Sequence, residues 1–231
     1  MKIGVMGAME EEIEPFLKEN SGFTKLNEEE YGQNIYHIGS FDKHEIVLAY
    51  SKIGKVNAAL TAATMIEKYG VNLILFTGVA GAVNKDLKIG DLIAAKKLCQ
   101  HDLDITAFGH KLGYVPGGAV YVNCDEKILS LAHKVATKKG LRLSDGIIAT
   151  GDQFVSSSEV KDKIAKIFDA DAIEMEGAAV AVVCDALNIP FFILRAISDA
   201  ADMDATFDFD TFLKESSKVS SSFIASLLKE I

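Results

Sequence analysis

The chain has 231 residues, of which 49% are hydrophobic and 25% charged, an ordinary balance for a globular protein with a substantial core. Its formal net charge of −9 argues against nucleic acid or an anionic membrane as a partner, because no basic surplus is present to meet phosphates. No apolar run approaches the ~18 residues that a membrane span needs, and the opening residues MKIGVMGAMEEE do not fit a signal peptide.

Strands and helices are predicted to alternate from the amino terminus onward. The apolar run 2–6 predicts a strand ending at Gly7, and the acidic segment after it predicts a helix, because acids are favoured in a first turn. Pro15 is compatible with that helix only if it also lies in the first turn. The next predicted elements are a hairpin within 34–51 turning at Asp42 and Lys43, a helix from Gly54 to Gly70, and a buried strand within 71–83.

The alternation continues to the carboxyl end. Strands are predicted at 91–95, 145–151, 171–175 and 191–199, and helices at 156–168, 176–188 and, with an amphipathic pattern, 212–227. We therefore predict one α/β domain spanning residues 1–231, with a central mixed, mostly parallel sheet flanked by helices. Cys99, Cys124 and Cys184 are odd in number and far apart, which favours a reduced cytoplasm over a disulfide framework or a zinc site.

Carboxylates and glycines follow several of the predicted strands, where α/β sheets bind their ligands. These segments are GAMEEE (7–12), TGVAG (77–81), EME (174–176) and SD (198–199), and TGDQFV (150–155) adds an aromatic residue beside a turn. Each segment alone is more simply explained as a helix start, a tight turn or a cap. Three carboxylates at separate strand ends, beside glycines and an aromatic ring, together indicate a binding site.

Two other kinds of site are disfavoured. IGVMGAME contains Gly4 and Gly7 but not the G-x-G-x-x-G pattern of dinucleotide-binding proteins, and three glutamates at that helix start would repel a pyrophosphate. HDLD (101–104), with His110 nearby, contains residue types that bind metals, but its spacing matches no known site. We expect a loop with solvated acids there, and no metal site.

The motifs as a set resemble those of the 5′-methylthioadenosine/S-adenosylhomocysteine nucleosidase family. They are GAMEEEI, SKIGKV, TGVAGA, HDLDITAFG, GDQFV, IEMEGAAVA and RAISDAAD, in order from residue 1 to about residue 227. EMEG together with RAISD is typical of the wider nucleoside phosphorylase/hydrolase superfamily, and GAMEEE is the more specific sign of the nucleosidase branch. The fold that the resemblance implies is therefore nucleoside phosphorylase-like.

The resemblance implies a homodimeric enzyme that hydrolyses the N-glycosidic bond of adenine thionucleosides to adenine and a free thioribose, without metal or cofactor. By the same resemblance, Glu12 activates the attacking water, Asp199 donates a proton toward the purine, and Glu176 holds the ribose hydroxyls. The remaining expected ligand contacts are Phe154, stacking near adenine; the backbone of Val155; Gly81; Met175, against the sugar; Met9, Ile53, Ser198 and Phe209, lining the pocket; and Ile105 and Phe108, from the partner subunit.

One departure from the family concerns the turn at 77–82. Many members have T-G-S-A-G-G where this chain has Val79 and Ala82, so only the backbone of the turn is expected to bind the ligand.

The residues also favour water over phosphate as the attacking group. Only two arginines are present, Arg142 and Arg195, and phosphate recognition favours arginine forks or a bare helix amino terminus. A carboxylate at Glu12 would repel phosphate but suits a general base for water. Arg195, in an apolar strand, is expected to pair with Glu174.

Several alternatives stay open at this point. The chain could be a purine nucleoside phosphorylase, or a nucleoside-binding protein without catalytic activity. Whether Asp199 holds its proton before the substrate binds is not decided by the residues. Nor is the 5′-substituent, since relatives accept methylthio and homocysteinyl groups and some act on 6-amino-6-deoxyfutalosine in menaquinone synthesis.

Overall fold

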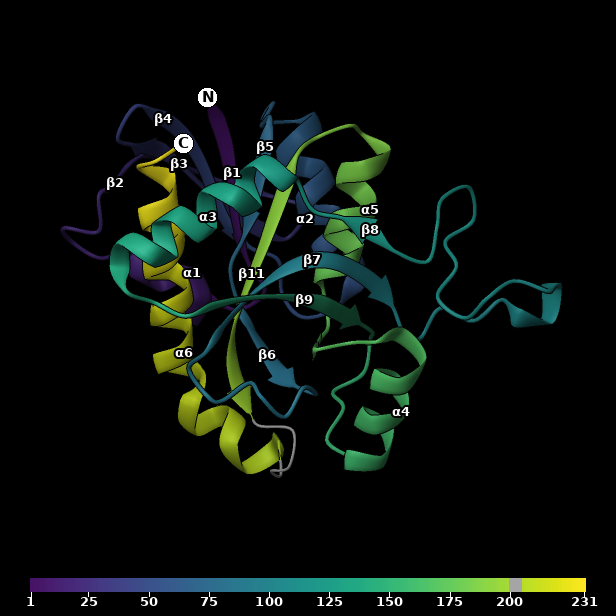
Figure 1. Ribbon diagram of the computed structural model, residues 1–231. Helices are drawn as coiled ribbons and strands as arrows, with labels where there is room; N and C mark the ends of the chain where they lie inside the picture. The colour runs from purple at the N-terminus through teal and green to yellow at the C-terminus, as the bar shows by residue number, and fades with distance from the viewer. Residues whose placement is uncertain (200–204) are drawn as a thin grey trace.

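A mixed sheet of eleven strands forms the centre of the computed structural model, which describes the backbone of residues 1–199 and 205–231 and the side chains of residues 1–199 and 212–231. The strand order is β2-β3-β4-β1-β5-β11-β6-β10-β9-β7-β8 (Figure 1). The strands are β1 (Lys2–Gly7), β2 (Phe23–Tyr31), β3 (Asn34–Phe41), β4 (His44–Tyr50), β5 (Leu73–Phe76), β6 (Val79–Ala82), β7 (Leu92–Gln100), β8 (Val122–Asn123), β9 (Leu143–Thr150), β10 (Ala172–Glu174) and β11 (Phe191–Asp199).

Strand β11 belongs to both halves of the sheet. Its first three residues pair with β5, and residues 196–199 pair with β6. Residues 194–196 pair in addition with β7, so the succession β6-β10-β9-β7 closes back on β11. All nine residues of β11 are buried, as expected of a strand at the centre of the fold.

The prediction of a mostly parallel sheet is wrong. Parallel pairing joins β1 to β4 and β5, β11 to β5 and β6, and β9 to β7 and β10. Antiparallel pairing joins β3 to β2 and β4, β7 to β8 and β11, and β6 to β10. One reason for the wrong prediction is that the sequence patterns did not reveal β2. This strand lies at the edge of the sheet, is mostly exposed, has four acidic or basic residues among Lys25–Glu30 and shows no apolar alternation.

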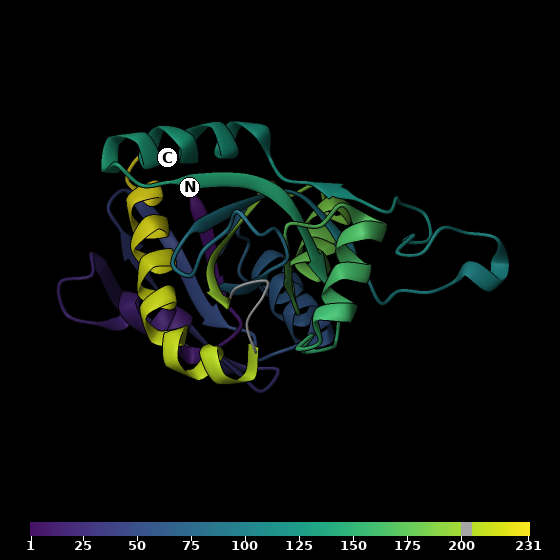
Figure 2. The same ribbon diagram turned by 60° about the horizontal axis from the view of Figure 1, so that its bottom comes forward.

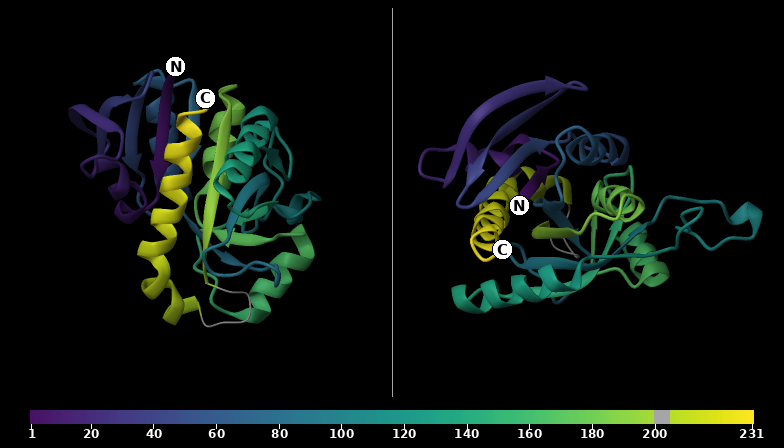
Figure 3. Two further views of the ribbon diagram at one scale, coloured as in Figure 1. Left: turned by 60° about the vertical axis from the view of Figure 1, so that its left-hand side comes forward. Right: turned by 90° about the horizontal axis from the view of Figure 1, so that it is seen from above.

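Helices cover both faces of the sheet, each over its own apolar cluster. The helices are α1 (Glu10–Leu17), α2 (Lys55–Glu67), α3 (Glu126–Lys139), α4 (Ser158–Phe168), α5 (Gly177–Ala186) and α6 (Ala205–Leu228). Buried side chains of α2 and α5 share one cluster, and those of α1, α3 and α6 share another on the opposite face. Figure 3 shows α6 running along the sheet on this second face. Helix α4 packs on a smaller third cluster that includes Val155 and Ile173.

The segment 101–121, which we call the arm, projects away from the body between β7 and β8 (Figures 1 and 2). It carries the short 3-10 helix η1 (Thr106–Phe108), in which Phe108 is 81% exposed. The predicted hairpin at Asp42 and Lys43 is confirmed as the turn between β3 and β4. The condition set for Pro15 is not met, because Pro15 is in the second turn of α1, a helix that ends two residues later at Leu17.

Candidate active site

A cavity of about 420 Å³ lies where β1, β6, β10 and β11 end. Ten of the thirteen ligand-contacting residues expected from the sequence line it: Met9, Glu12, Ile53, Gly81, Phe154, Val155, Met175, Glu176, Ser198 and Asp199. Ala8, Val79, Ala80, Gln153, Lys161, Ile173 and Glu174 complete the lining. The three carboxylates assigned to catalysis are thus brought together from separate segments.

Glu12 is held by three backbone N–H groups. It is the third residue of α1, and its Oε2 accepts hydrogen bonds from Ala8 N at 2.5 Å and Met9 N at 3.1 Å, as an acid at this position does when it caps its own helix. Its Oε1 accepts from Val79 N at 3.1 Å, which ties α1 to the start of β6. Burial raises the pKa of Glu12, against the opposing effects of Arg195 and the three N–H donors. A carboxylate with a raised pKa suits a base working near neutral pH.

Glu174 is the structural member of the EME segment. Its Oε2 accepts hydrogen bonds from Glu176 N at 3.1 Å and Gly177 N at 2.7 Å, so it satisfies the first N–H groups of α5. Its Oε1 accepts from the Thr150 hydroxyl. Arg195 Nη2 donates to Glu174 Oε2 at 2.7 Å, and both side chains are buried, which confirms the predicted pair.

Glu176 is left to face the cavity because Glu174 serves the end of α5. Within the described structure, the carboxylate of Glu176 accepts a hydrogen bond from the backbone N–H of Gly54, which donates to Oε1 at 2.8 Å. Burial, and the neighbouring charge of Glu174, raise the pKa of Glu176 to about 8. Gly54 has a φ of +102° at the start of α2, a conformation that glycine adopts without strain. This conformation of Gly54 directs its N–H toward Glu176.

Asp199 is the last residue of β11, beyond an irregularity in the pairing with β6. It pairs with Gly81, where an added Cβ would come within 2.7 Å of Asp199 Oδ2, so a larger residue at 81 would displace the carboxylate. The Ser198 hydroxyl donates to Oδ1 at 3.1 Å, and Lys161 Nζ donates to Oδ2 at 3.0 Å. Both oxygens of the predicted acid are therefore held by neighbours.

Lys161 was missed by the sequence reasoning. It lies on α4, is 3% exposed, and both lines the cavity and forms an ion pair with Asp199. A signal was present, because Lys161 precedes Ile164 by three residues and Phe168 by seven and so falls on the apolar face of its helix. A lysine on such a face is seldom buried without an acidic partner.

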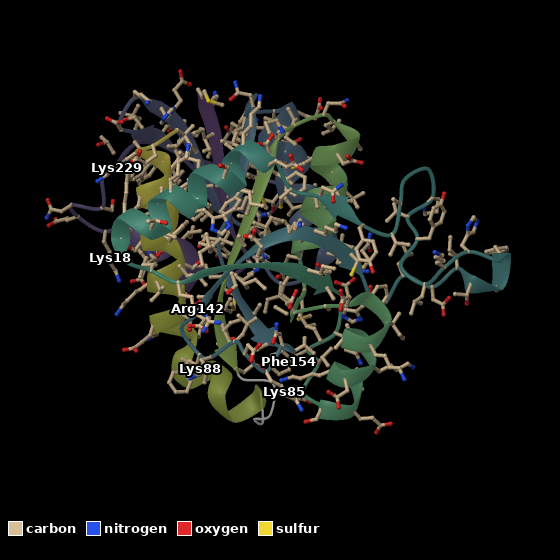
Figure 4. All side chains as sticks on the ribbon, viewed as in Figure 1. Lys18, Lys85, Lys88, Arg142, Phe154 and Lys229 are labelled. Carbon is tan, nitrogen blue, oxygen red and sulfur yellow. The ribbon has the colours of Figure 1, made fainter. Side chains whose placement is uncertain are left out.

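The apolar rim of the cavity is partly open. Phe154 is 47% exposed and Ile53 is 52% exposed, both at the mouth. Figure 4 places the Phe154 side chain near the lower edge of the molecule, between the end of β6 and helix α4 in that view. Ile105 and Phe108 lie on the arm and do not line the cavity of their own chain. Phe209 belongs to residues 200–211, whose side chains lie outside the described structure.

An acid of the HDLD segment forms an ion pair close to the cavity. Lys55 Nζ donates to Asp102 Oδ1 at 2.7 Å, and Asp102 Oδ2 accepts from Asp152 N at 2.8 Å. These contacts join the start of α2, the base of the arm and the segment leading to Phe154. Among the described residues there is no group of three or more His, Cys, Asp or Glu side chains that could hold a metal ion.

The comparisons with known proteins cover the whole chain. A family model described as the phosphorylase superfamily matches residues 2–229. The aminodeoxyfutalosine nucleosidase of Campylobacter jejuni is 53% identical over 231 residues, which is 100% of both chains. A solved structure of futalosine hydrolase from Helicobacter pylori superposes with a TM-score of 0.97 at 45% identity, covering 100% of this chain and 98% of the other. A 5′-methylthioadenosine/S-adenosylhomocysteine nucleosidase structure from Campylobacter jejuni gives 0.93 at 53% identity, covering 100% of both.

Proposed function

The chain belongs to the phosphorylase superfamily, and we propose that it is a nucleosidase that hydrolyses the N-glycosidic bond of adenine nucleosides carrying a bulky 5′-group. Its substrates are 6-amino-6-deoxyfutalosine, 5′-methylthioadenosine and S-adenosylhomocysteine, and its products are adenine and the free sugar. The observation that carries the proposal is the meeting of Glu12, Glu176 and Asp199 in one cavity.

The charges around the cavity suit the cleavage of a ribosyl–purine bond. Such a cleavage leaves positive charge on the sugar and negative charge on the departing base, and fixed carboxylates around the sugar stabilise the first of these. In the proposed reaction Glu176 accepts hydrogen bonds from the ribose hydroxyls, which is supported by its position in the cavity and by the hydrogen bond that Gly54 N donates to its Oε1. Glu176 then both binds the ribose hydroxyls and faces the positive charge that develops on the sugar.

Glu12 is the general base of the proposed reaction. Its raised pKa and its fixed position, with three N–H donors, favour proton abstraction from a water molecule next to the sugar. Asp199 acts on the opposite reactant, the purine, and delivers a proton to a ring nitrogen as the bond to the sugar breaks.

Water is favoured over phosphate as the attacking group because neither Arg142 nor Arg195 is among the described residues that line the cavity. Arg195 is engaged by Glu174 beneath the floor, and Arg142 is an exposed partner of Asp91. Lys161, the cation in the lining, is paired with Asp199. A phosphate beside Glu12 would meet a carboxylate without a free arginine to offset the repulsion.

The 5′-group is assigned from the relatives together with the apolar rim. The Campylobacter jejuni aminodeoxyfutalosine nucleosidase and the Campylobacter jejuni structure named for 5′-methylthioadenosine and S-adenosylhomocysteine both match at 53% identity. We propose that this chain acts on both kinds of nucleoside and serves methionine salvage and menaquinone synthesis. Met9 and Ile53 offer an apolar surface to a thioether or an aromatic group.

We propose that the enzyme is a homodimer and that it works in a reducing cytoplasm. The projecting arm, with Phe108 exposed at its tip, supports a role for Ile105 and Phe108 in completing the partner's cavity. The buried, unpaired state of Cys99, Cys124 and Cys184 supports a reducing compartment. Among the described residues, no helix is long and apolar enough to span a membrane.

The experiment that tests the proposal is adenine release from 6-amino-6-deoxyfutalosine, 5′-methylthioadenosine and S-adenosylhomocysteine, each with and without phosphate. Release in phosphate-free buffer with formation of the free sugar is the expected result. Release only with phosphate, yielding the sugar 1-phosphate, would make the protein a phosphorylase. Binding without release would make it a nucleoside-binding protein.

A further inference from the structure

Lys161 is a buried cation in the cavity, whose other ionisable lining residues in the described structure are acids. Within the described structure, the ionisable side chains of the lining are Glu12, Lys161, Glu174, Glu176 and Asp199. Lys161 Nζ is 3.0 Å from Asp199 Oδ2, and each residue is 3% exposed. A buried ion pair is seldom kept for stability alone, since apolar residues of similar volume are often as stabilising. The pair therefore calls for a chemical explanation.

The location of the proton in this pair bears on the proposed reaction. Lys161 Nζ donates to Asp199 Oδ2, and a carboxylate oxygen that accepts a hydrogen bond from an ammonium group carries no proton on that atom. A carboxylate in that state has no proton of its own to deliver to a purine. Among the described side chains, Lys161 donates to Oδ2 at 3.0 Å and the Ser198 hydroxyl donates to Oδ1 at 3.1 Å, and the ammonium group is the more acidic of these two donors.

We propose that Lys161 supplies the proton that Asp199 passes to the departing purine. The inference rests on the proposed function, in which Asp199 acts toward the base. It adds a residue on α4 to the reaction and makes Asp199 a relay instead of a pre-protonated acid. Lys161 acts through Asp199 and need not touch the substrate.

The relay conserves atoms and charge. As the bond between the sugar and the purine breaks, its electron pair stays with the purine, and a ring nitrogen becomes basic. An N–H bond of Lys161 breaks while an O–H bond forms on Oδ2 of Asp199; that O–H bond then breaks as an N–H bond forms on the purine. The attacking water gives its hydroxyl to the sugar and its proton to Glu12. After the products leave, Glu12 releases a proton to solvent and Lys161 takes one up.

The neighbouring contacts fit this direction of transfer. Ser198 donates to Oδ1 of Asp199, so the carboxylate is fixed while Oδ2 faces Lys161. Gly81 leaves room for the carboxylate, because a Cβ there would lie within 2.7 Å of Oδ2. Glu12, Glu174 and Glu176 share the cavity, and each of these side chains that is ionised favours the retention of a cation there.

Substitution of Lys161 by arginine or methionine distinguishes two roles for this residue, a source of the proton and a fixed positive charge. Lys161→Arg keeps a cation beside Asp199, but a guanidinium does not give up its proton in proteins. Lys161→Met keeps the length of the side chain without the charge. Lys163→Met, on the exposed side of the same helix, is the control and keeps wild-type turnover.

The measurement is kcat and KM for adenine release between pH 5 and pH 9, with adenine binding and thermal unfolding measured on each variant. Lys161→Arg is expected to lose kcat by roughly 10²–10⁴-fold at every pH, with adenine binding retained, because proton transfer contributes that much. Lys161→Met is expected to lose as much at alkaline pH and to regain kcat as the pH falls, since a proton from solvent then replaces the one that Lys161 supplied.

Wild-type kcat in Lys161→Arg would overturn the relay and leave Lys161 as a positioning charge. A loss in Lys161→Met that is the same at every pH would overturn it as well, and that profile decides the matter if the arginine variant does not fold. Failure of the proposed function is distinct, because the wild-type protein would then release no adenine from any of the three nucleosides.

Discussion

Arg195 Nη2 lies 2.7 Å from Glu174 Oε2 beneath the floor of the cavity, with Arg195 1% and Glu174 6% exposed. The same Glu174 oxygen accepts hydrogen bonds from the first two N–H groups of the EGAAVA segment. The pair therefore fixes the start of α5 in place, and with it the backbone that presents Glu176 to the cavity. Two carboxylates two residues apart thus differ in their surroundings, one held in a buried pair and one facing the cavity.

We expect Glu174→Gln to lower both the free energy of unfolding and the turnover number. Removing one partner of a buried ion pair leaves the other charge uncompensated, at a cost of about 3–5 kcal/mol. Denaturant unfolding and adenine release measure the two effects. The control is Glu230→Gln, which breaks the exposed pair with Lys138 and should cost only about 0.2–1 kcal/mol. Equal stability and equal turnover for Glu174→Gln and the wild type would contradict the assignment.

Glu12→Gln is expected to lower kcat by about 10²–10⁴-fold and to leave KM nearly unchanged, because it removes the base but not the sugar contacts. It should also destabilise the protein by about 1–3 kcal/mol, since both Glu12 oxygens accept from N–H groups and an amide nitrogen cannot. Steady-state kinetics and thermal unfolding test both statements. Glu10→Gln, an exposed neighbour on the same helix, is the control. Retention of wild-type kcat by Glu12→Gln would remove Glu12 from the chemistry.

Gly81→Ala is expected to lower both turnover and stability. The added methyl group would meet the Asp199 carboxylate and move it out of line with its partners, which include the buried ammonium group of Lys161. A loss of at least about tenfold in kcat is expected, because a misplacement of about 1 Å can cost up to 10²-fold. Gly118→Ala, where the nearest heavy atom is 3.6 Å from the added carbon, should leave kcat unchanged. Equal kcat in the two variants would show that the carboxylate tolerates the methyl group.

The strand ends were predictable because the apolar runs before Gly7, Gly78 and Asp199 are long and clear, and because parallel strands bring their carboxyl ends to one edge. The pairing of Glu174 with Arg195 was predictable because few groups can neutralise an arginine in an apolar strand. The position of Lys161 in the cavity was not predictable, since a lysine on a helix usually extends to solvent. The contact from Gly54 N to Glu176 joins residues 122 positions apart and depends on a turn conformation, which residue types alone do not specify.

The stability of the fold should depend on pH through Glu176. Its pKa is raised from 4.5 to about 8, so the folded protein binds more protons than the unfolded chain between these values. The contribution of Glu176 to stability is thus complete below about pH 4.5, declines as the pH rises, and is lost above about pH 8. Denaturant unfolding of the wild type and of Glu176→Gln at intervals from pH 5 to pH 9 isolates this group, because the other titrations largely cancel. A difference in unfolding free energy that does not fall with rising pH would contradict the raised pKa.

The sugar specificity should depend on the same residue. Glu176 can accept hydrogen bonds from two ribose hydroxyls, and a site built to bind a hydroxyl rejects the analogue that lacks it by up to ~10⁴–10⁵-fold in kcat/KM. We therefore expect the 2′-deoxy form of 5′-methylthioadenosine to be a poor substrate of the wild type. Glu176→Ala should lose activity toward the ribonucleoside and lose most of the discrimination, because no unpaired carboxylate remains to reject the deoxy sugar. The ratio of kcat/KM for the two nucleosides, measured in both proteins, decides this. A ratio that survives in Glu176→Ala would place the hydroxyl contacts elsewhere in the cavity and leave Glu176 with an electrostatic role toward the sugar cation alone.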